Sequence, residues 1–321
     1  MTIESFAQQL NTWGAERTPF LFIVDFEMRK PLAFRLDEVD PAYVLFKFNH
    51  FSNVDQSSKT TVKLVKHPVS VAEYNRRFDK VYSHLLYGDT FLTNLTVKTP
   101  IELNASLREI FFASEARYKL LFKNEFLVFS PETFIRIADG KIFSFPMKGT
   151  IDARIPNAKS ILLSDKKEEA EHITIVDLIR NDLSQVATNI TVSRFRYVEE
   201  LKTNQKNLLQ VSSEISGQLS DDYHSRLGEI LVALLPAGSV SGAPKPKTLE
   251  VIREAEGEDR GYYTGVFGYY DGEKLDSAVM IRYIEKSGDQ LFYRSGGGIT
   301  AQSNAMQEYK EVIDKIYVPV N

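Results

Sequence analysis

The spacing of hydrophobic and polar residues predicts a chain built mainly of short strands. Apolar residues at every second position, or short apolar runs bounded by turn residues, are typical of strands, and a spacing of three or four is typical of helices. The strand-like runs are 20–27, 43–48, 62–66, 90–98, 117–123, 125–129, 133–138, 190–199, 207–215, 262–270, 274–285 and 290–294. Helical patterns occupy about 70–87, 104–115, 165–187, 223–235, 244–255 and 304–317.

The order of these elements favours antiparallel sheets. Few strands alternate one-to-one with helices, which is the order that a doubly wound parallel sheet requires. Neighbouring runs instead form hairpin-like pairs, such as 262–270 with 274–285 across a turn at 270–273. No internal repeat or low-complexity segment is visible. We therefore predict an antiparallel α+β fold in which residues 1–321 form one continuous domain.

Two candidate reactive residues, Glu132 and Lys148, stand at the ends of strand-like runs. Glu132 lies in Ser-Pro-Glu after the run 125–129, and Lys148 lies in Phe-Pro-Met-Lys-Gly-Thr after the run 141–145. Strands joined at the Asp-Gly turn 139–140 would bring the two residues together. Apolar neighbours would favour the neutral, nucleophilic form of the lysine, and the glutamate could donate a proton. The alternative is a solvated lysine in an ordinary turn.

Composition excludes several classes of site. The chain has 39 Lys and Arg against 43 Asp and Glu, a net charge of −4, without a long block of one sign, so neither nucleic acid nor a membrane is an expected partner. It has no cysteine, and its five histidines lack zinc spacing, so any metal should be a hard cation bound by oxygen. The N-terminus has no apolar signal region and no stretch reaches transmembrane length. We expect a soluble, cytoplasmic protein.

Two predicted helices carry pairs of acids that could hold such a cation. The pairs are Glu168 with Glu171 and Glu308 with Glu311. Each pair is spaced i, i+3 and therefore lies on one helix face. Two such pairs could converge on Mg²⁺, which takes one or two carboxylates directly and keeps several waters. The alternatives are a capping box that begins at Asp165 and an ordinary i, i+4 ion pair of Glu311 with Lys315.

Three further features are suited to an anion. The glycine run in 295–300 follows a strand and could expose backbone N–H groups to a carboxylate, although a flexible connector is the alternative. The segment 238–245 ends in proline at a predicted helix start, where free N–H groups bind anions. Arg282 lies in the run 277–284, which is apolar on both faces, so it needs a partner. That partner could be a bound carboxylate or a protein acid.

Read in order, these segments resemble the chorismate-utilising enzyme family, which includes anthranilate, aminodeoxychorismate, isochorismate and salicylate synthases. The resemblance spans about 130–315 and rests on SPETF (130–134), FPMKGT (145–150), EHITIVDLIRNDL (171–183), GSVSGAPKPKTLEVI (238–252), EAEGEDRGYYTGVFGY (254–269), MIRY (280–283) and GGGIT (296–300). It implies a β-sandwich-like core with helices around the outside. It also implies a catalytic core at about 70–318 after a shortened N-terminal part, 1–70.

Within the family, lysine at position 148 resembles the aminodeoxychorismate synthases, because anthranilate synthases typically carry alanine there. The resemblance implies that Lys148 attacks C2 of chorismate, that Glu132 protonates the departing C4 hydroxyl, and that ammonia then adds at C4. It implies Mg²⁺ as the cofactor, with Glu171 and Glu311 as direct ligands and Glu168 and Glu308 bound through water. The implied substrate-binding residues are Arg282, Lys315, Gly298, Gly297, Ser239 and Gly242. Gln210 departs from the pattern, because many members carry histidine there.

The source of nitrogen follows from the composition. A glutaminase of the usual kind needs a cysteine, and this chain has none. Ammonia is therefore expected from solution or from a separate glutamine amidotransferase subunit. The alternatives are an anthranilate- or isochorismate-type enzyme on the same scaffold and a non-catalytic chorismate-binding protein.

Overall fold

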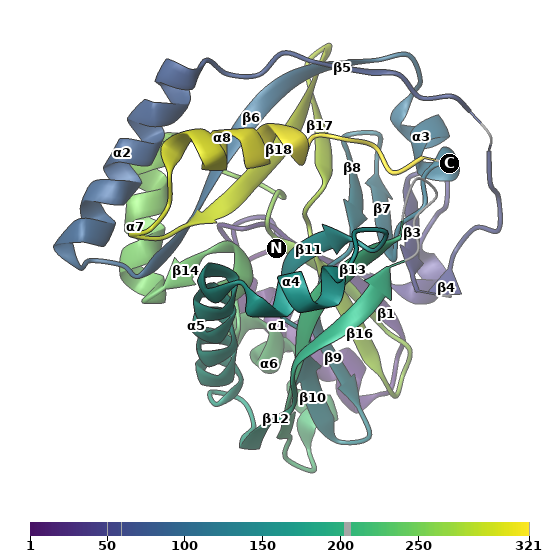
Figure 1. The fold of residues 1–321 in the computed structure, drawn as a ribbon. Helices are drawn as coiled ribbons and strands as arrows, with labels where there is room; N and C mark the ends of the chain where they lie inside the picture. Colours follow the sequence, from purple (N-terminus) through teal and green to yellow (C-terminus); the bar gives the residue numbers. More distant parts are fainter. Residues whose placement is uncertain (50, 59, 202–206, 321) are drawn as a thin grey trace.

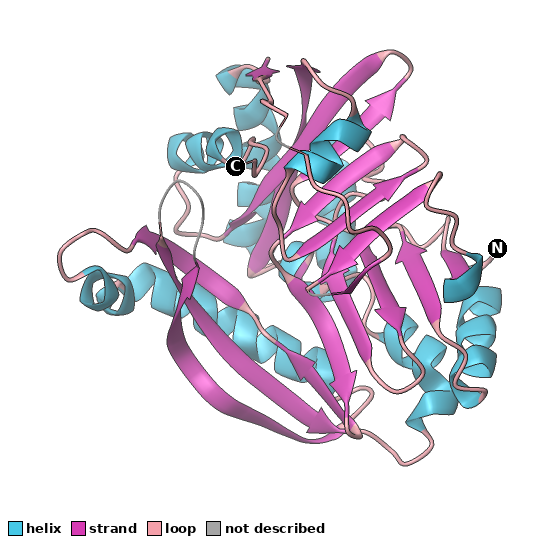
Figure 2. Cartoon of the chain, turned by 90° about the vertical axis from the view of Figure 1, so that its right-hand side faces the viewer, coloured by secondary structure: helices cyan, strands magenta, loops and turns pink. Residues whose placement is uncertain are grey.

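Two antiparallel sheets form the centre of the molecule, with helices on their outer sides (Figures 1 and 2). The computed structural model describes residues 1–49, 51–58, 60–201 and 207–320. In spatial order, the first sheet contains β11 (Met147–Asp152), β13 (Leu208–Gln218), β10 (Lys141–Ser144), β9 (Thr133–Ala138), β16 (Leu275–Val279), β15 (Val266–Tyr270), β1 (Phe20–Val24) and β2 (Leu32–Arg35), and β12 (Thr188–Leu201) pairs with β13. The second contains β14 (Gly242–Ala243), β6 (Leu92–Leu103), β18 (Gln290–Ile299), β17 (Tyr283–Ser287), β8 (Phe126–Ser130), β7 (Tyr118–Phe122), β3 (Val44–Phe48) and β4 (Phe51–Ser52), and β5 (Leu64–Lys66) pairs with β6.

Helices cover the outer faces of both sheets. They are α1 (Ile3–Ala15), α2 (Val71–Tyr87), α3 (Leu107–Ala113), α4 (Ala158–Ser164), α5 (Lys166–Leu183), α6 (Leu227–Ala233), α7 (Lys245–Glu256) and α8 (Ala305–Asp314), with short 3-10 turns η1 (Leu36–Glu38), η2 (Tyr223–Arg226) and η3 (Gly238–Val240). Helices α1, α5 and α6 pack on the first sheet, and α2, α7 and α8 pack on the second. Among the described residues, no helix is long and apolar enough to cross a membrane.

The alternation of side chains along β1 explains why both of its faces are buried. Leu21 and Ile23 point into the core between the two sheets, where they meet residues of the second sheet such as Phe46. Phe20 and Phe22 point the other way, toward the core beneath α1 and α6. This arrangement confirms the predicted α+β fold, with antiparallel sheets packed as a sandwich and helices outside.

The expected long strand at 274–285 is wrong, because the chain changes sheets inside it. β16 belongs to the first sheet and β17 to the second, and the residues between them turn a corner at Met280–Arg282. Arg282 has φ +54° there, and the facing residue Thr264 has φ +60°. The Thr264 N–H donates to the Met280 carbonyl at 2.8 Å, and the Met280 N–H donates to the Gly265 carbonyl at 2.7 Å. The two neighbouring segments, around Thr264 and around Met280, therefore bend together at this corner.

Candidate active site

The hairpin of β9 and β10 brings Glu132 and Lys148 into one cleft, as the sequence predicted. Its turn residues Asp139 and Gly140 have φ +52° and +72°, which suits a two-residue hairpin. Glu132 immediately precedes β9, and Lys148 lies in β11, two residues after Pro146. Lys148 is therefore a strand residue rather than a turn residue. Both side chains line the same cleft.

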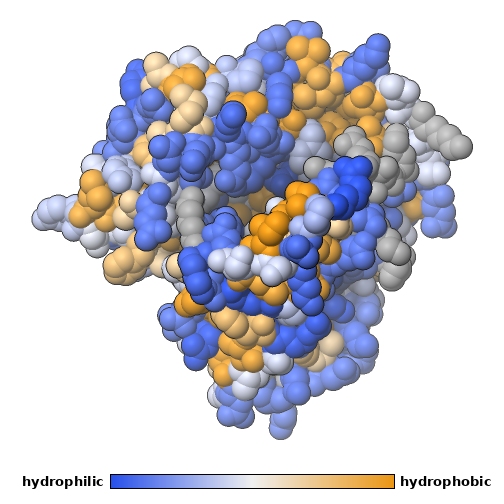
Figure 3. Space-filling model, viewed as in Figure 1, coloured by the Kyte–Doolittle hydropathy of each residue, from blue (hydrophilic) through white to orange (hydrophobic). Residues whose placement is uncertain are grey.

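The cleft lies between the second sheet on one side and β11 with α5 on the other. Its walls combine residues of β6 and β18 with the segment after η3, and it encloses about 550 Å³, part of it open to solvent. Figure 3 shows the surface hollowed between the hydrophilic region of α8 and hydrophobic side chains near α4. An apolar wall with a few charged groups is typical of a small-molecule site.

Lys148 is held as a cation, which corrects the expectation of a neutral amine. Its Nζ lies 2.7 Å from Oε2 of Glu171, and the lysine side chain is 27% exposed. Burial alone would lower the pKa of Lys148, but the charges of Glu171, Glu168 and Glu311 outweigh it, so this pKa is raised. The sequence showed the apolar neighbours of the lysine, whereas its acidic partners come from α5 and α8.

Glu132 is a half-buried acid whose protonated form is favoured. Burial raises the pKa of its carboxyl, although the Ser239 hydroxyl and the positive charges of Arg282 and Lys315 act in the opposite direction. The Ser239 Oγ donates a hydrogen bond to Glu132 Oε1. A carboxyl whose pKa is raised toward the working pH is better suited to serve as a general acid.

Of the two acids on α5, Glu171 lines the cleft and Glu168 lies close to Gly149 of β11. The alternative of a helix cap is partly right, because Asp165 Oδ1 accepts the backbone N–H of Glu168 at 3.0 Å. The Glu168 carboxyl nevertheless points toward β11, since Oε2 lies 3.4 Å from where a Cβ on Gly149 would stand. Burial and the charges of Glu171, Asp165 and Glu311 raise the pKa of Glu168, although Lys148 opposes them. Its Oε2 is buried without a hydrogen-bond partner.

The acids of α8 meet the same site from the other side. A Cβ on Gly297 would stand 3.6 Å from Glu308 Oε2, 3.7 Å from Lys315 Nζ and 3.8 Å from Glu311 Oε1. The predicted i, i+4 pair is confirmed, with Lys315 Nζ 2.6 Å from Glu311 Oε1. Lys315 also donates to the Gly296 carbonyl at 2.8 Å. Burial lowers the pKa of Lys315, with the charges of Arg282 and Lys148 adding to the effect and Glu311 opposing it.

The donor chemistry of this site fits Mg²⁺. Carboxylates from two helices converge, since the charge of Glu311 on α8 acts on Glu168 of α5. Among the described residues, the buried Oε2 of Glu168 has no hydrogen-bond partner. This oxygen could therefore contact a cation or a water bound to the cation. In the part of the chain that the structure describes, no three acidic or histidine side chains stand in metal-binding geometry. Lysine ammonium groups instead neutralise Glu171 and Glu311.

Arg282 reaches the site from the corner between the sheets rather than from a central strand. Its Nε donates to the Tyr317 hydroxyl at 3.3 Å, and its guanidinium lies over the Tyr317 ring. Burial disfavours the cation, but Tyr317 and Tyr293 outweigh this, and the pKa of Arg282 is raised. Within the described ranges no ion pair joins Arg282 to a protein acid, so the structural alternative is not supported.

The glycine run is part of β18, so the alternative of a flexible connector is wrong. Gly297 and Gly298 pair with Leu95 and Asn94 of β6, and Gly298 lines the cleft. Gly242 also lines the cleft, with φ +137°, and a Cβ there would stand 1.9 Å from the Leu92 carbonyl oxygen. Only glycine fits at position 242.

Three residues near the cleft were missed from the sequence. Asn94 and Ser241 line it, and Asn94 Oδ1 is buried without a hydrogen-bond partner. His172, which follows Glu171, is 1% exposed and its Nε2 lies 2.7 Å from Ser213 Oγ. Burial lowers the pKa of His172 to about 4. Its place within the 171–183 segment was a usable signal, whereas Asn94 depends on strand register.

Gln210, the departure from the family pattern, lies on β13 opposite Thr150 of β11. Its Oε1 is buried without a hydrogen-bond partner in the described part of the chain. It is not among the residues that line the cleft.

Comparison with known proteins gives a consistent result. A model of chorismate binding enzymes matches residues 25–321. An uncharacterized PabA-like protein of Haemophilus influenzae is 46% identical over 99% of this chain and 98% of its own length. The aminodeoxychorismate synthase component 1 of Salmonella typhimurium is 32% identical over 76% of this chain, which covers 56% of that synthase. The crystal structure of anthranilate synthase component I from Streptococcus pneumoniae matches with a TM-score of 0.67 at 26% identity, over 82% of this chain and 60% of that one.

Proposed function

Because this chain belongs to the chorismate binding enzyme family, we propose that it aminates chorismate at C4 to give 4-amino-4-deoxychorismate, the precursor of para-aminobenzoate in folate biosynthesis. The observation that carries the proposal is Lys148, which lies in the cleft together with Glu132. A lysine can attack a ring carbon, and an alanine at this position could not. The similarity to an aminodeoxychorismate synthase supports the same reaction.

The first chemical step forms a bond between Lys148 and the substrate. The neutral Nζ attacks C2, both ring double bonds shift by one position toward C4, and the C4–O bond breaks. The proton of Glu132 goes to the departing hydroxyl, which leaves as water. Lys148 must first lose its proton and its pairing with Glu171, which lies 2.7 Å away. Glu132 ends this step as a carboxylate.

The second step releases the product. The lone pair of ammonia forms the C4–N bond, and the electrons of the C2–N bond return to Lys148, which leaves as a neutral amine. The new C4 ammonium then gives a proton to Glu132, which restores the acid. Atoms and charges balance as chorismate plus ammonia going to aminodeoxychorismate plus water.

Charged groups around the cleft would orient the substrate. Arg282 and Lys315 suit the two carboxylates of chorismate, because paired cations hold a dianion in a fixed position. Glu171 and Glu311 would bind Mg²⁺ directly, and Glu168 and Glu308 would do so through water. When bound, the ion would supply positive charge next to a substrate carboxylate.

Ammonia would come from a separate glutamine amidotransferase subunit, because the chain has no cysteine to attack glutamine. Incubation with chorismate, Mg²⁺ and ammonium, followed by mass analysis, tests the reaction. We expect aminodeoxychorismate with ammonium and none with ammonium-free glutamine. Activity should rise with pH as ammonium loses its proton to give ammonia, and ionisation of Glu132 above its raised pKa should act in the opposite direction. Anthranilate with pyruvate would assign the chain to the rival reaction, which the structural similarity to an anthranilate synthase favours. Turnover of glutamine by the chain alone would contradict the two-component scheme.

A further inference from the structure

A second cavity adjoins the cleft behind Glu132. It has a volume of about 390 Å³, part of it open to solvent, and shares Glu132, Pro146 and Ser239 with the cleft. Away from that shared neck, it is lined by residues of α5 and by Leu234, at the end of α6. We call this space the rear cavity. The function proposed above uses only the cleft, so the rear cavity has no assigned role.

One face of α5 lines both spaces. Glu171 and Ile175 face the cleft, whereas Ile179 and Leu183 face the rear cavity. These four residues follow one another at intervals of four, which places them in a single row along the helix. The cleft and the rear cavity therefore lie end to end beneath α5, with the Glu132 carboxyl at the junction.

The walls of the rear cavity suit a small, uncharged guest. Most of its lining is apolar, and its polar side chains already have partners within the protein. The Thr133 and Tyr118 hydroxyls lie 2.7 Å apart, and Ser144 Oγ donates to the Phe134 carbonyl at 3.2 Å. An ion entering this space would lose its hydration without gaining a new partner, which costs several kcal/mol.

Asp182, the acid of α5 that lines the rear cavity, is paired with a fixed positive charge. Lys245 Nζ lies 3.1 Å from Asp182 Oδ2 and also donates to the Leu234 carbonyl at 3.2 Å. Both side chains are largely buried, at 17% and 12% exposed. Asp182 is thereby neutralised and does not attract ammonium.

We propose that the rear cavity admits ammonia, as the uncharged base, to the substrate carbon next to Glu132. This inference rests on the amination proposed above. Chorismate would fill the cleft, so the second substrate needs an entrance that the first does not block. Ammonia from the rear cavity would form the C4–N bond as the C2–N bond to Lys148 breaks. The proton released at the new amine would pass to the Glu132 carboxylate at the neck.

Filling the rear cavity tests the proposal. Leu183→Phe and Ile179→Phe each add volume inside it at positions that do not line the cleft. Val186→Phe is the matched control, because Val186 is half-buried against the same hydrophobic core but does not line the cavity. For each purified variant, the KM for ammonia is measured at saturating chorismate and Mg²⁺. Chorismate binding without ammonia is measured by calorimetry, and a thermal melt checks folding.

We expect both filled variants to raise the KM for ammonia by about tenfold or more, with chorismate affinity within about twofold of the wild type. The control should change neither constant. If one filled variant fails to fold, the other still decides the question. An unchanged KM for ammonia in a folded variant that binds chorismate overturns the rear entrance and leaves the amination standing. Absence of any aminated product from the wild-type chain overturns both.

Discussion

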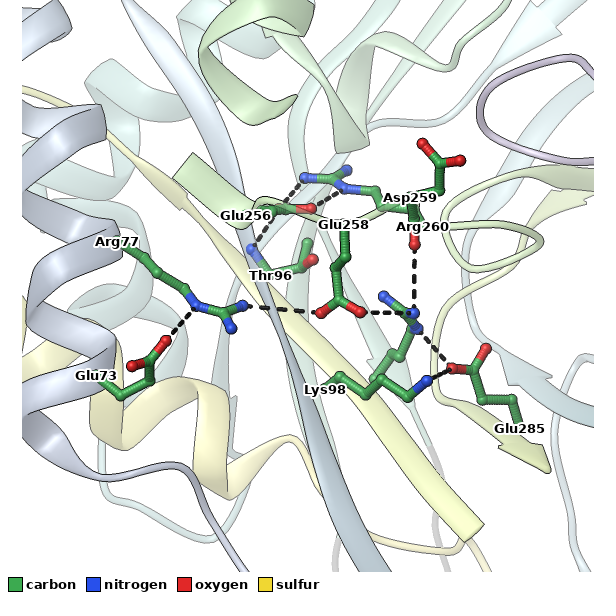
Figure 4. Close-up of polar contacts among 10 residues, drawn as sticks. Glu73, Arg77, Thr96, Lys98, Glu256, Glu258, Asp259, Arg260 and Glu285 are labelled. Carbon is green, nitrogen blue, oxygen red and sulfur yellow. Dashed lines mark hydrogen bonds and ion pairs between the residues drawn. The ribbon is translucent and has the colours of Figure 1, made fainter. Parts of the chain in front are cut away.

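Two groups of charged residues in this protein use the same side chains in opposite ways. The first, which we call the Arg260 network, contains the pair of Arg260 with Glu256 and a chain of contacts from Glu73 to Glu285 that meets it at the Asp259 carbonyl (Figure 4). The second is the acidic cleft around Lys148 and Lys315. In the first group each charge meets an opposite charge or a backbone partner. In the second, acids outnumber bases and crowd together.

The Arg260 network is closed by direct contacts. Arg260 and Glu256 are each 1% exposed and lie 2.6 Å apart, and Glu256 also accepts the Thr96 N–H at 2.9 Å. Arg260 donates in addition to the Val240 and Asn94 carbonyls at 2.8 and 2.7 Å. Arg294 extends the network by pairing with Glu258 and Glu285. These contacts tie α7 to β6 and to the segment before the corner.

The difference separates a structural role from a binding role. The charged side chains of the Arg260 network pair directly with one another or with backbone groups, so the network stabilises one arrangement of the chain. In the cleft, repulsion among carboxylates contributes to the raised pKa of Glu168, which is a cost in the absence of a ligand. The proposed binding of a cation and a dianion requires such charges to stay available. We therefore expect changes in the cleft to reduce activity and changes in the network to reduce stability.

The largest expected effect is on Lys148. Lys148→Ala should lower the rate of aminodeoxychorismate formation by at least about 1,000-fold, because the nucleophile is lost. The melting temperature and chorismate binding should stay close to wild type. Lys141→Ala, which removes an exposed lysine at the start of β10, is the control and should keep full activity. A near wild-type rate for Lys148→Ala would show that the lysine is not the nucleophile.

The four acids should divide into two classes in Mg²⁺ titrations. Glu168→Gln and Glu308→Gln should raise the Mg²⁺ concentration needed for activity by about 10- to 100-fold, as expected for outer carboxylates that bind through water. Glu171→Gln and Glu311→Gln should raise it further, because each removes a direct ligand. Glu250→Gln, in an exposed ion pair on α7, is the control. Small, equal effects at all four positions would identify them as ordinary surface acids.

Breaking the Arg260 network should act on stability instead. Arg260→Met leaves Glu256 buried without its partner, so we expect a loss of about 3–5 kcal/mol in the free energy of unfolding, measured with urea. The folded fraction should keep a near wild-type KM for chorismate. Lys247→Met, which breaks the exposed pair with Glu250, should leave the free energy of unfolding close to that of the wild type, because exposed ion pairs contribute little. Equal losses of unfolding free energy in the two variants would show that the Arg260 network is no more important for stability than an exposed ion pair.

The smallest effect should be a gain in stability. The raised pKa of Glu168 in the folded state means that the fold loses stability as pH rises above the carboxyl's unfolded value. In metal-free buffer at neutral pH, Glu168→Gln should therefore melt at or above the wild-type temperature, with no gain at pH below the unfolded value. Glu109→Gln is the opposite case, because hydrogen bonds from Ser106 lower the pKa of Glu109. That variant should melt lower at neutral pH. A lower melting temperature for Glu168→Gln would show that Lys148 outweighs the crowding.

The sequence predicted the elements that depend on local signals. The Asp139-Gly140 turn and its flanking apolar runs were enough to place Glu132 and Lys148 at one site. Helix α1 was missed because its buried residues Phe6 and Leu10 are few among polar neighbours, and its packing against α6 compensates. The hairpin is stabilised by contacts between residues close in the sequence, whereas α1 is stabilised by contacts with the distant helix α6.

Other features could not be read from the sequence because they depend on distant partners. The run 274–285 contains no proline or glycine, so nothing in its sequence marks the change of sheet after Val279. The protonation of Lys148 is set by Glu171 on α5, and the part of Asn94 in the cleft is set by the register of β6 with β18. The residue types indicated which side chains could react, whereas tertiary contacts determine their protonation and position.

At the corner between the sheets, the backbone torsion angles of two residues are energetically costly. Thr264 is β-branched and Arg282 is long, yet both hold left-handed conformations that glycine or asparagine would adopt at lower cost. Each such residue costs on the order of 1–3 kcal/mol. At position 282 the local preference of the backbone and the need for a guanidinium are in conflict, and the guanidinium is present. In a library of substitutions, selection for stability alone should favour glycine at position 282, and selection for turnover should restore arginine.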